Sequence, residues 1–143
     1  MLEIKNLTKT YPNGKKAVSN LSMTIEDGDL FGFIGKNGAG KTTTLKACLT
    51  IHDFDSGDIL LNGISIKTAP TECKRKMAYV PDSPILETYL TGLQYLNFIC
   101  DIYGVPTHTR KKRIYDLSER LGMCDKLNDL ISSYSHGMKQ KIT

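Results

Sequence analysis

The chain has no long apolar run and no closely spaced cysteine pair. No stretch of its 143 residues approaches the ~20 apolar residues of a membrane span, and the N-terminal MLEIKNLTKTY lacks the basic-then-apolar layout of a signal peptide. The four cysteines stand far apart without a C-x-x-C spacing, so neither a zinc site nor a redox motif is indicated. Reduced thiols in a cytosolic protein are the simplest interpretation. Any membrane association is then expected to go through a partner.

The chain also lacks a strong excess of charge. Its net charge of +4 is too small and too dispersed to argue for nucleic-acid binding, although it could help to attract nucleotide phosphates. With 40% hydrophobic and 24% charged residues, the composition is that of an ordinary globular protein. Its length corresponds to one domain or part of one.

The most informative pattern runs from Leu30 to Ile51. The apolar run Leu30–Ile34 predicts a buried strand, and a loop and a helix are expected to follow it. The spacing is G-x-x-x-x-G-K-[ST] in the strand-loop-helix context that a phosphate-binding loop requires. The residues of this loop and of the helix start are Gly35, Lys36, Asn37, Gly38, Ala39, Gly40, Lys41, Thr42 and Thr43.

Each residue type in this loop has a chemical reason. Glycine lets the backbone curl closely around phosphate oxygens, and a helix N-terminus offers unpaired N–H groups and a positive dipole end. We expect Lys41 to reach the β- and γ-phosphates and Thr42 to offer its hydroxyl to a Mg²⁺ ion. The alternative, a glycine loop that merely joins strand to helix, is disfavoured by the matched context.

Hydrophobic periodicity predicts the remaining elements. Before Asp82 the chain is rich in strands, including two hairpins with turns at Pro12–Gly14 and Asn62–Gly63. The predicted strands are Leu2–Tyr11, Val18–Ile25, Gly57–Leu61, Ile64–Ile66 and Met77–Val80. After Asp82 the pattern is helical, and Ser135 is a plausible N-cap of the last helix. The expected core-facing stripes are Leu45, Cys48 and Leu49; Leu93, Leu96, Cys100 and Tyr103; and Ile114, Leu117 and Leu121.

Two features of the helical part invite other interpretations. The run Arg110–Arg113 is more typical of a solvated helix face than of a nucleic-acid or lipid patch. Phe98–Asp101 looks like a strand that ends in a metal-binding aspartate, but it lies within helical periodicity. We therefore expect neither run to be catalytic.

With both glycine-bearing helix starts in view, the whole chain resembles the ATP-binding subunit of ABC transporters. GKNGAGKTT at Gly35–Thr43 resembles the Walker A motif, and YSHGMKQK at Tyr134–Lys141 resembles the signature motif. Tyr11 is similar to the aromatic residue on which adenine stacks, although the residue pattern alone favours an ordinary strand aromatic. The signature residues that the resemblance brings to an ATP molecule across a dimer are Ser135, His136, Gly137 and Met138.

The resemblance implies an incomplete α/β P-loop NTPase fold of the ABC type. Residues 1–81 would form the antiparallel β part and the nucleotide-binding core, 82–134 the helical subdomain, and 135–143 the start of the signature helix. In the family, the Walker B strand, the general-base glutamate and the switch histidine follow the signature, so no catalytic residue is assigned. We expect a C-terminally truncated domain that binds nucleotide better than it hydrolyses it, with an unpaired sheet edge beside Leu30–Ile34.

Two positions depart from the family pattern. Asp82 stands where the family usually has glutamine; it could ligate Mg²⁺ but lacks the amide that orients a water, and it could equally open a turn. At the signature, His136 and Met138 replace a glycine and the glutamine.

The resemblance also implies a function and partners. ATP and Mg²⁺ would be the cofactors, and a homodimer or heterodimer of ATP-binding subunits would drive a transmembrane permease from the cytoplasmic face of the cell membrane. The signature form favours export, and no nucleic-acid partner is expected. Two alternatives remain: a short regulatory module that binds nucleotide without hydrolysis, and an ABC-type ATPase that acts on ribosomes or DNA.

Overall fold

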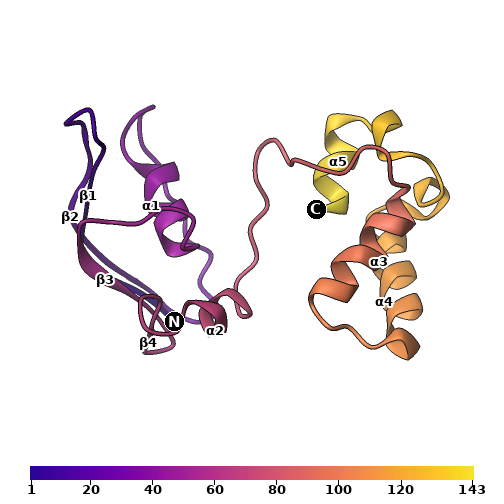
Figure 1. The fold of residues 1–143 in the computed structure, drawn as a ribbon, viewed down its shortest axis with the longest axis horizontal. Coiled ribbons are helices and arrows are strands. Elements are labelled where there is room, and N and C mark those ends of the chain that lie inside the picture. The colour runs from indigo at the N-terminus through magenta and orange to yellow at the C-terminus, as the bar shows by residue number, and fades with distance from the viewer. The chain divides into compact units, whose positions relative to one another are not determined.

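The chain forms two compact units. The computed structural model describes all residues from 1 to 143, with one unit at 1–79 and the other at 80–143 (Figure 1). The first unit combines a sheet with two helices, and the second is helical. None of the helices is both long enough and apolar enough to span a bilayer.

The sheet of the first unit has four antiparallel strands in the order β2-β1-β3-β4. Strand β1 is central and pairs Leu2 with Ile25 on one side and with Leu61 on the other. Both predicted hairpins are confirmed. The strands are β1 (Leu2–Thr10), β2 (Lys16–Ile25), β3 (Ser56–Leu61) and β4 (Ile64–Ser65).

The turn between β3 and β4 shows why its two residues predicted a hairpin. Asn62 and Gly63 both have positive φ angles, 50° and 77°, which asparagine and glycine tolerate best. The Asn62 N–H donates to the Met1 carbonyl at 2.9 Å, so the turn also holds the start of β1.

Helix α1 (Lys41–Cys48) packs against the sheet through small side chains. Thr44, Ala47 and Cys48 are buried, whereas Leu45 is 45% exposed. The predicted stripe of Leu45, Cys48 and Leu49 is therefore wrong for Leu45. The buried Thr44 hydroxyl is satisfied because it donates to the Gly40 carbonyl at 3.0 Å. The core of this unit consists of Ile4, Leu7, Val18, Ala47, Cys48, Ile59, Ile66 and Cys73.

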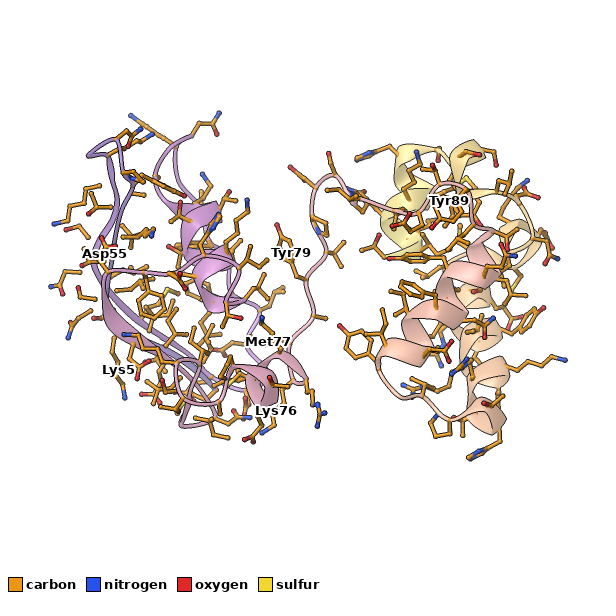
Figure 2. The ribbon with its side chains drawn as sticks, viewed as in Figure 1. Lys5, Asp55, Lys76, Met77, Tyr79 and Tyr89 are labelled. Atoms are coloured by element: carbon orange, nitrogen blue, oxygen red, sulfur yellow. The ribbon has the colours of Figure 1, made fainter.

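Two predicted strands are absent. Leu30–Ile34 and Met77–Val80 form no strand, and the side chains of Leu30 and Ile34 are almost fully exposed. Met77 and Tyr79 lie on the segment that follows helix α2 (Pro70–Lys74) (Figure 2). A strand needs a neighbour for its N–H and C=O groups, and no strand within residues 1–143 pairs with either run. Their apolar side chains thus favoured the prediction of buried strands, but the fold provides no neighbouring strand with which they could pair.

The second unit is built from three helices and two short 3-10 turns. Helix α3 (Gly92–Ile102) begins with a capping box in which Thr91 and Gln94 bond each other's backbone. Figure 1 shows α3 alongside α4 (Thr107–Arg120). The turns Cys124–Lys126 and Ile131–Ser133 lead to α5 (His136–Ile142). The core consists of Met123, Ile131, Tyr134 and Ile142.

The helical predictions hold for element type but only partly for burial. Phe98–Asp101 lies inside α3, as its periodicity predicts. Ile114 of α4 is buried, but Leu117 is 55% exposed and Leu121, directly after the helix end, is 44% exposed. These two leucines line an apolar cavity of about 280 Å³ rather than a closed core. Tyr103 lies beyond the end of α3 and is also exposed, so the predicted stripe is wrong at that position.

Gly57→Ala is expected to destabilise the first unit strongly. Gly57 has φ of 94°, and a Cβ there would lie 2.5 Å from the carbonyl oxygens of Lys5 and Asn6. We expect a loss of about 3 kcal/mol in the free energy of unfolding from steric overlap and left-handed strain. Gly63→Ala is the control, because Gly63 also has positive φ but open space around it, and should cost only about 1 kcal/mol. Equal urea midpoints for the two variants would contradict this.

Cys48 is expected to resist alkylation in the folded protein. Burial raises the pKa of the Cys48 thiol from 9.0 to about 11. At pH 8 its thiolate fraction is then roughly a hundredfold lower than that of an ordinary cysteine, and protection is lost as the pH rises toward 11. Peptide mass spectrometry after timed iodoacetamide treatment should show Cys100 and Cys124 modified well before Cys48. Similar rates at all three would show that this burial is wrong.

Candidate phosphate-binding loop

The predicted phosphate loop ends at Gly40, a position that only glycine can occupy. Gly40 is the N-cap of α1 with φ of 88°, and a Cβ on it would overlap the carbonyl oxygen of Ala17 in β2. The last residue of the loop is thereby held against the sheet. Gly38, with φ of 85°, makes the second left-handed step in the loop.

This conformation leaves a row of backbone donors free. The N–H groups of Gly40, Lys41, Thr42 and Thr43 donate no hydrogen bond within the protein, as expected where a helix begins without a side-chain cap. The first turn of α1 also contains no acidic residue. Free N–H groups and the positive end of the helix dipole together favour an anion at this point.

Lys41 lies over the loop rather than in solvent. Its ammonium group donates to the carbonyl oxygens of Gly35 and Lys36, the latter at 2.9 Å. A lysine has three N–H donors, so one remains for a ligand oxygen. Thr42 is exposed at the helix start, and its hydroxyl has no partner within the protein. No group of three or more His, Cys, Asp or Glu side chains could hold a metal by itself.

The structure brings Tyr11 to the start of α1. The Tyr11 hydroxyl lies 3.1 Å from Thr43 Oγ1, and Asp55 fixes the preceding residue by accepting from the Thr10 N–H at 2.6 Å. Asp55 lies beside the sheet in Figure 2. The Tyr11 ring is half-buried, with the Lys9 ammonium 6.0 Å from its centroid. Tyr11 thus borders the loop that the sequence predicted separately.

Sequence reasoning missed Lys15. Its ammonium nitrogen lies 3.9 Å from the position that a Cβ on Gly38 would take. Lys15 belongs to the turn between β1 and β2, and only the folded hairpin brings that turn to the loop. Nothing in its local sequence signals this proximity. It adds a cation to those of Lys36 and Lys41.

The signature residues lie at the start of α5 in the second unit. Ser135 is the N-cap, and its hydroxyl accepts from the Met138 N–H at 3.3 Å, as predicted. His136 and Gly137 are exposed, and a Cβ on Gly137 would meet nothing within 4 Å. Met138 packs against the core of the unit, so only its backbone faces the helix start.

Asp82 also belongs to the second unit and is exposed. Its carbonyl oxygen accepts from Gln140 Nε2 at 3.2 Å, which ties the turn at Asp82 to α5. The carboxylate itself has no hydrogen-bond partner within the protein. Its role as a Mg²⁺ ligand together with Thr42 stays a prediction.

Comparisons with known proteins agree with this geometry. The ABC transporter family model matches residues 18–143. An ABC transporter ATP-binding protein of Bacillus subtilis, YhcH, is 34% identical over 143 residues, covering 99% of this chain and 45% of YhcH. The peptide export ATP-binding protein SkfE of the same organism is 32% identical, covering 99% of this chain and 58% of SkfE.

A solved structure described as the ATP-binding subunit of an ABC transporter is similar to the whole chain. The TM-score is 0.89 at 29% sequence identity, over 99% of this chain and 59% of that one. The chain thus spans about half the length of these relatives. The predicted ABC-type P-loop fold, in incomplete form, is confirmed, although the strand before the loop is unpaired. The chain belongs to the ABC transporter family, and it matches part of that family's ATP-binding proteins.

Proposed function

We propose that this chain is the part of an ABC transporter ATPase that binds ATP through residues 35–43. The observation that carries the proposal is the row of unpaired N–H groups from Gly40 to Thr43, bordered by the Lys41 ammonium. These donors match the oxygen-rich, negatively charged tail of a nucleoside triphosphate. The free Thr42 hydroxyl suits a Mg²⁺ ion that also binds phosphate oxygens.

Each residue has a distinct task in this proposal. The backbone N–H groups of the loop orient the phosphates, and Lys41 neutralises their charge. Tyr11 offers a ring face to the adenine base, and Lys15 supplies further positive charge at the loop. Mg²⁺, held by Thr42, would withdraw charge from the phosphate oxygens.

Transport belongs to the complete, dimerised protein. There, the helix start at Ser135, His136, Gly137 and Met138 would contact the ATP molecule held by a second ATP-binding subunit. Hydrolysis would then drive a transmembrane permease from the cytoplasmic face of the membrane. The name of SkfE, a peptide export protein, supports export as the direction.

Lys41→Ala is expected to abolish binding of Mg-ATP. The change removes an ammonium group that the Gly35 and Lys36 carbonyls hold over the loop, where the phosphates would bind. We expect a loss of at least about 3 kcal/mol, or roughly 150-fold in affinity, measured by equilibrium dialysis. Lys46→Ala, which removes the same charge from the last turn of α1, is the matched control. Unchanged affinity for Lys41→Ala would refute the assignment of the loop.

Tyr11 is expected to act through its ring rather than its hydroxyl. Tyr11→Phe keeps the ring but loses the contact with Thr43, and should bind Mg-ATP within about twofold of the unmodified chain. Tyr11→Ala removes the stacking surface and should weaken binding by roughly tenfold, since base–aromatic stacking is worth about 1–3 kcal/mol. Isothermal titration of both variants tests this. A loss for Phe as large as that for Ala would assign the role to the hydroxyl instead.

A further inference from the structure

The cationic run Arg110–Arg113 has no part in the proposed ATP site. It directly follows the first turn of α4, where a cavity of about 380 Å³ opens between α3 and α4. Two of the four cations, Arg110 and Lys111, line this cavity, and no carboxylate does. The lining residues are Leu93, Asn97, Thr107, Arg110, Lys111, Ile114 and Tyr115.

Arg110 is held beneath the surface with its charge only partly met. Its side chain is 14% exposed, and it pairs with Asp101 at 2.7 Å and donates to the Val105 carbonyl at 2.9 Å. Its Nε–H is buried and has no acceptor. The Asp101 carboxylate is 68% exposed, so water competes for it. Asp101 and Val105 thus meet only part of the hydrogen-bonding capacity of this largely buried guanidinium, and a buried polar group without a partner is costly.

The start of α4 adds positive potential at the same cavity. The helix begins at Thr107, a cavity residue, without a side-chain cap and without an acidic residue in its first turn. Cations close to a helix N-terminus repel the positive end of its dipole. The sequence thus gathers Arg110 and Lys111 where local electrostatics disfavour them. A bound anion would satisfy both the cations and the helix end.

We propose that this cavity binds a compact oxyanion with the size and charge of inorganic phosphate. Lys111, which is exposed, and Arg110, which is largely buried, both line the cavity and supply the charge. Hydroxyl groups of Thr107 and Tyr115 supply further donors. Leu93 and Ile114 make part of the wall apolar, which favours a small ligand over an extended polyanion. This site is separate from the ATP loop and does not depend on that assignment.

The test is a titration of the ¹⁵N-labelled 143-residue chain with inorganic phosphate at constant ionic strength, followed by amide chemical shifts. We expect saturable shifts at Thr107, Lys111 and Tyr115. Lys111→Gln should weaken phosphate binding about tenfold, the effect of losing one charge-assisted contact. The matched control is Lys112→Gln, which removes the same charge one residue away, outside the lining, and should change the affinity less than about twofold.

The two variants separate a site from general charge attraction. Equal weakening by Lys111→Gln and Lys112→Gln would overturn the proposal, as would shifts that rise linearly without saturation. Phosphate that binds at the loop instead would shift Gly38 and Lys41, and those signals report on the ATP site alone. Loss of shifts at Thr107 with shifts kept at Gly38 would therefore refute this cavity while leaving the proposed ATP binding intact.

Discussion

The close approach of Gly40 to the Ala17 carbonyl is the contact on which the proposed nucleotide site depends. It fixes the end of the loop, and hence the N-terminus of α1, against strand β2. Because β2 continues from the turn after β1, the same contact brings Tyr11 and Lys15 to the loop. A side chain at position 40 would push the helix start away from the sheet. The free N–H groups, the stacking ring and the extra cation would then no longer converge.

Much of this structure was predictable because some residue types strongly favour one local backbone conformation. Asn62 and Gly63 specified a turn, Ser135 specified a helix start, and the glycine spacing specified the loop. In each case the deciding interaction lies within a few residues of the chain. The resemblance to ABC proteins supplied the fold class, which local rules alone would not have given.

The failures share a different cause, because they depend on contacts distant in sequence. Leu30–Ile34 has a strand's composition, but a strand requires a neighbour to accept its hydrogen bonds, and composition does not supply one. Leu45 and Leu117 lie on helices of the predicted type, but each helix buries a different face from the predicted one. Helix α1 buries Thr44 and Ala47, and α4 buries Ser118. The position of Lys15 near the loop was not predicted, because only the folded hairpin places it beside Gly38.

In each unit, one helix start combines a lack of acidic residues with nearby cationic side chains. In α1 the first turn is free of acidic residues and is bordered by Lys36 and Lys41; in α4 it is again free of acidic residues and precedes Arg110 and Lys111. Only the first has the left-handed glycines that let backbone N–H groups face a chain of phosphates. We therefore propose nucleotide binding at α1 and only a compact anion at α4.

The most direct test of the central claim is paramagnetic broadening by Mn²⁺-ATP in the ¹⁵N-labelled chain. Mn²⁺ takes the place of Mg²⁺ beside the phosphates and broadens only the amide signals close to it. The account predicts loss of signals from Gly38 to Thr43 at substoichiometric Mn²⁺-ATP, reversed by excess Mg²⁺-ATP. Full intensity at these residues while signals elsewhere broaden would contradict it, and the loop would then be a structural connection between sheet and helix.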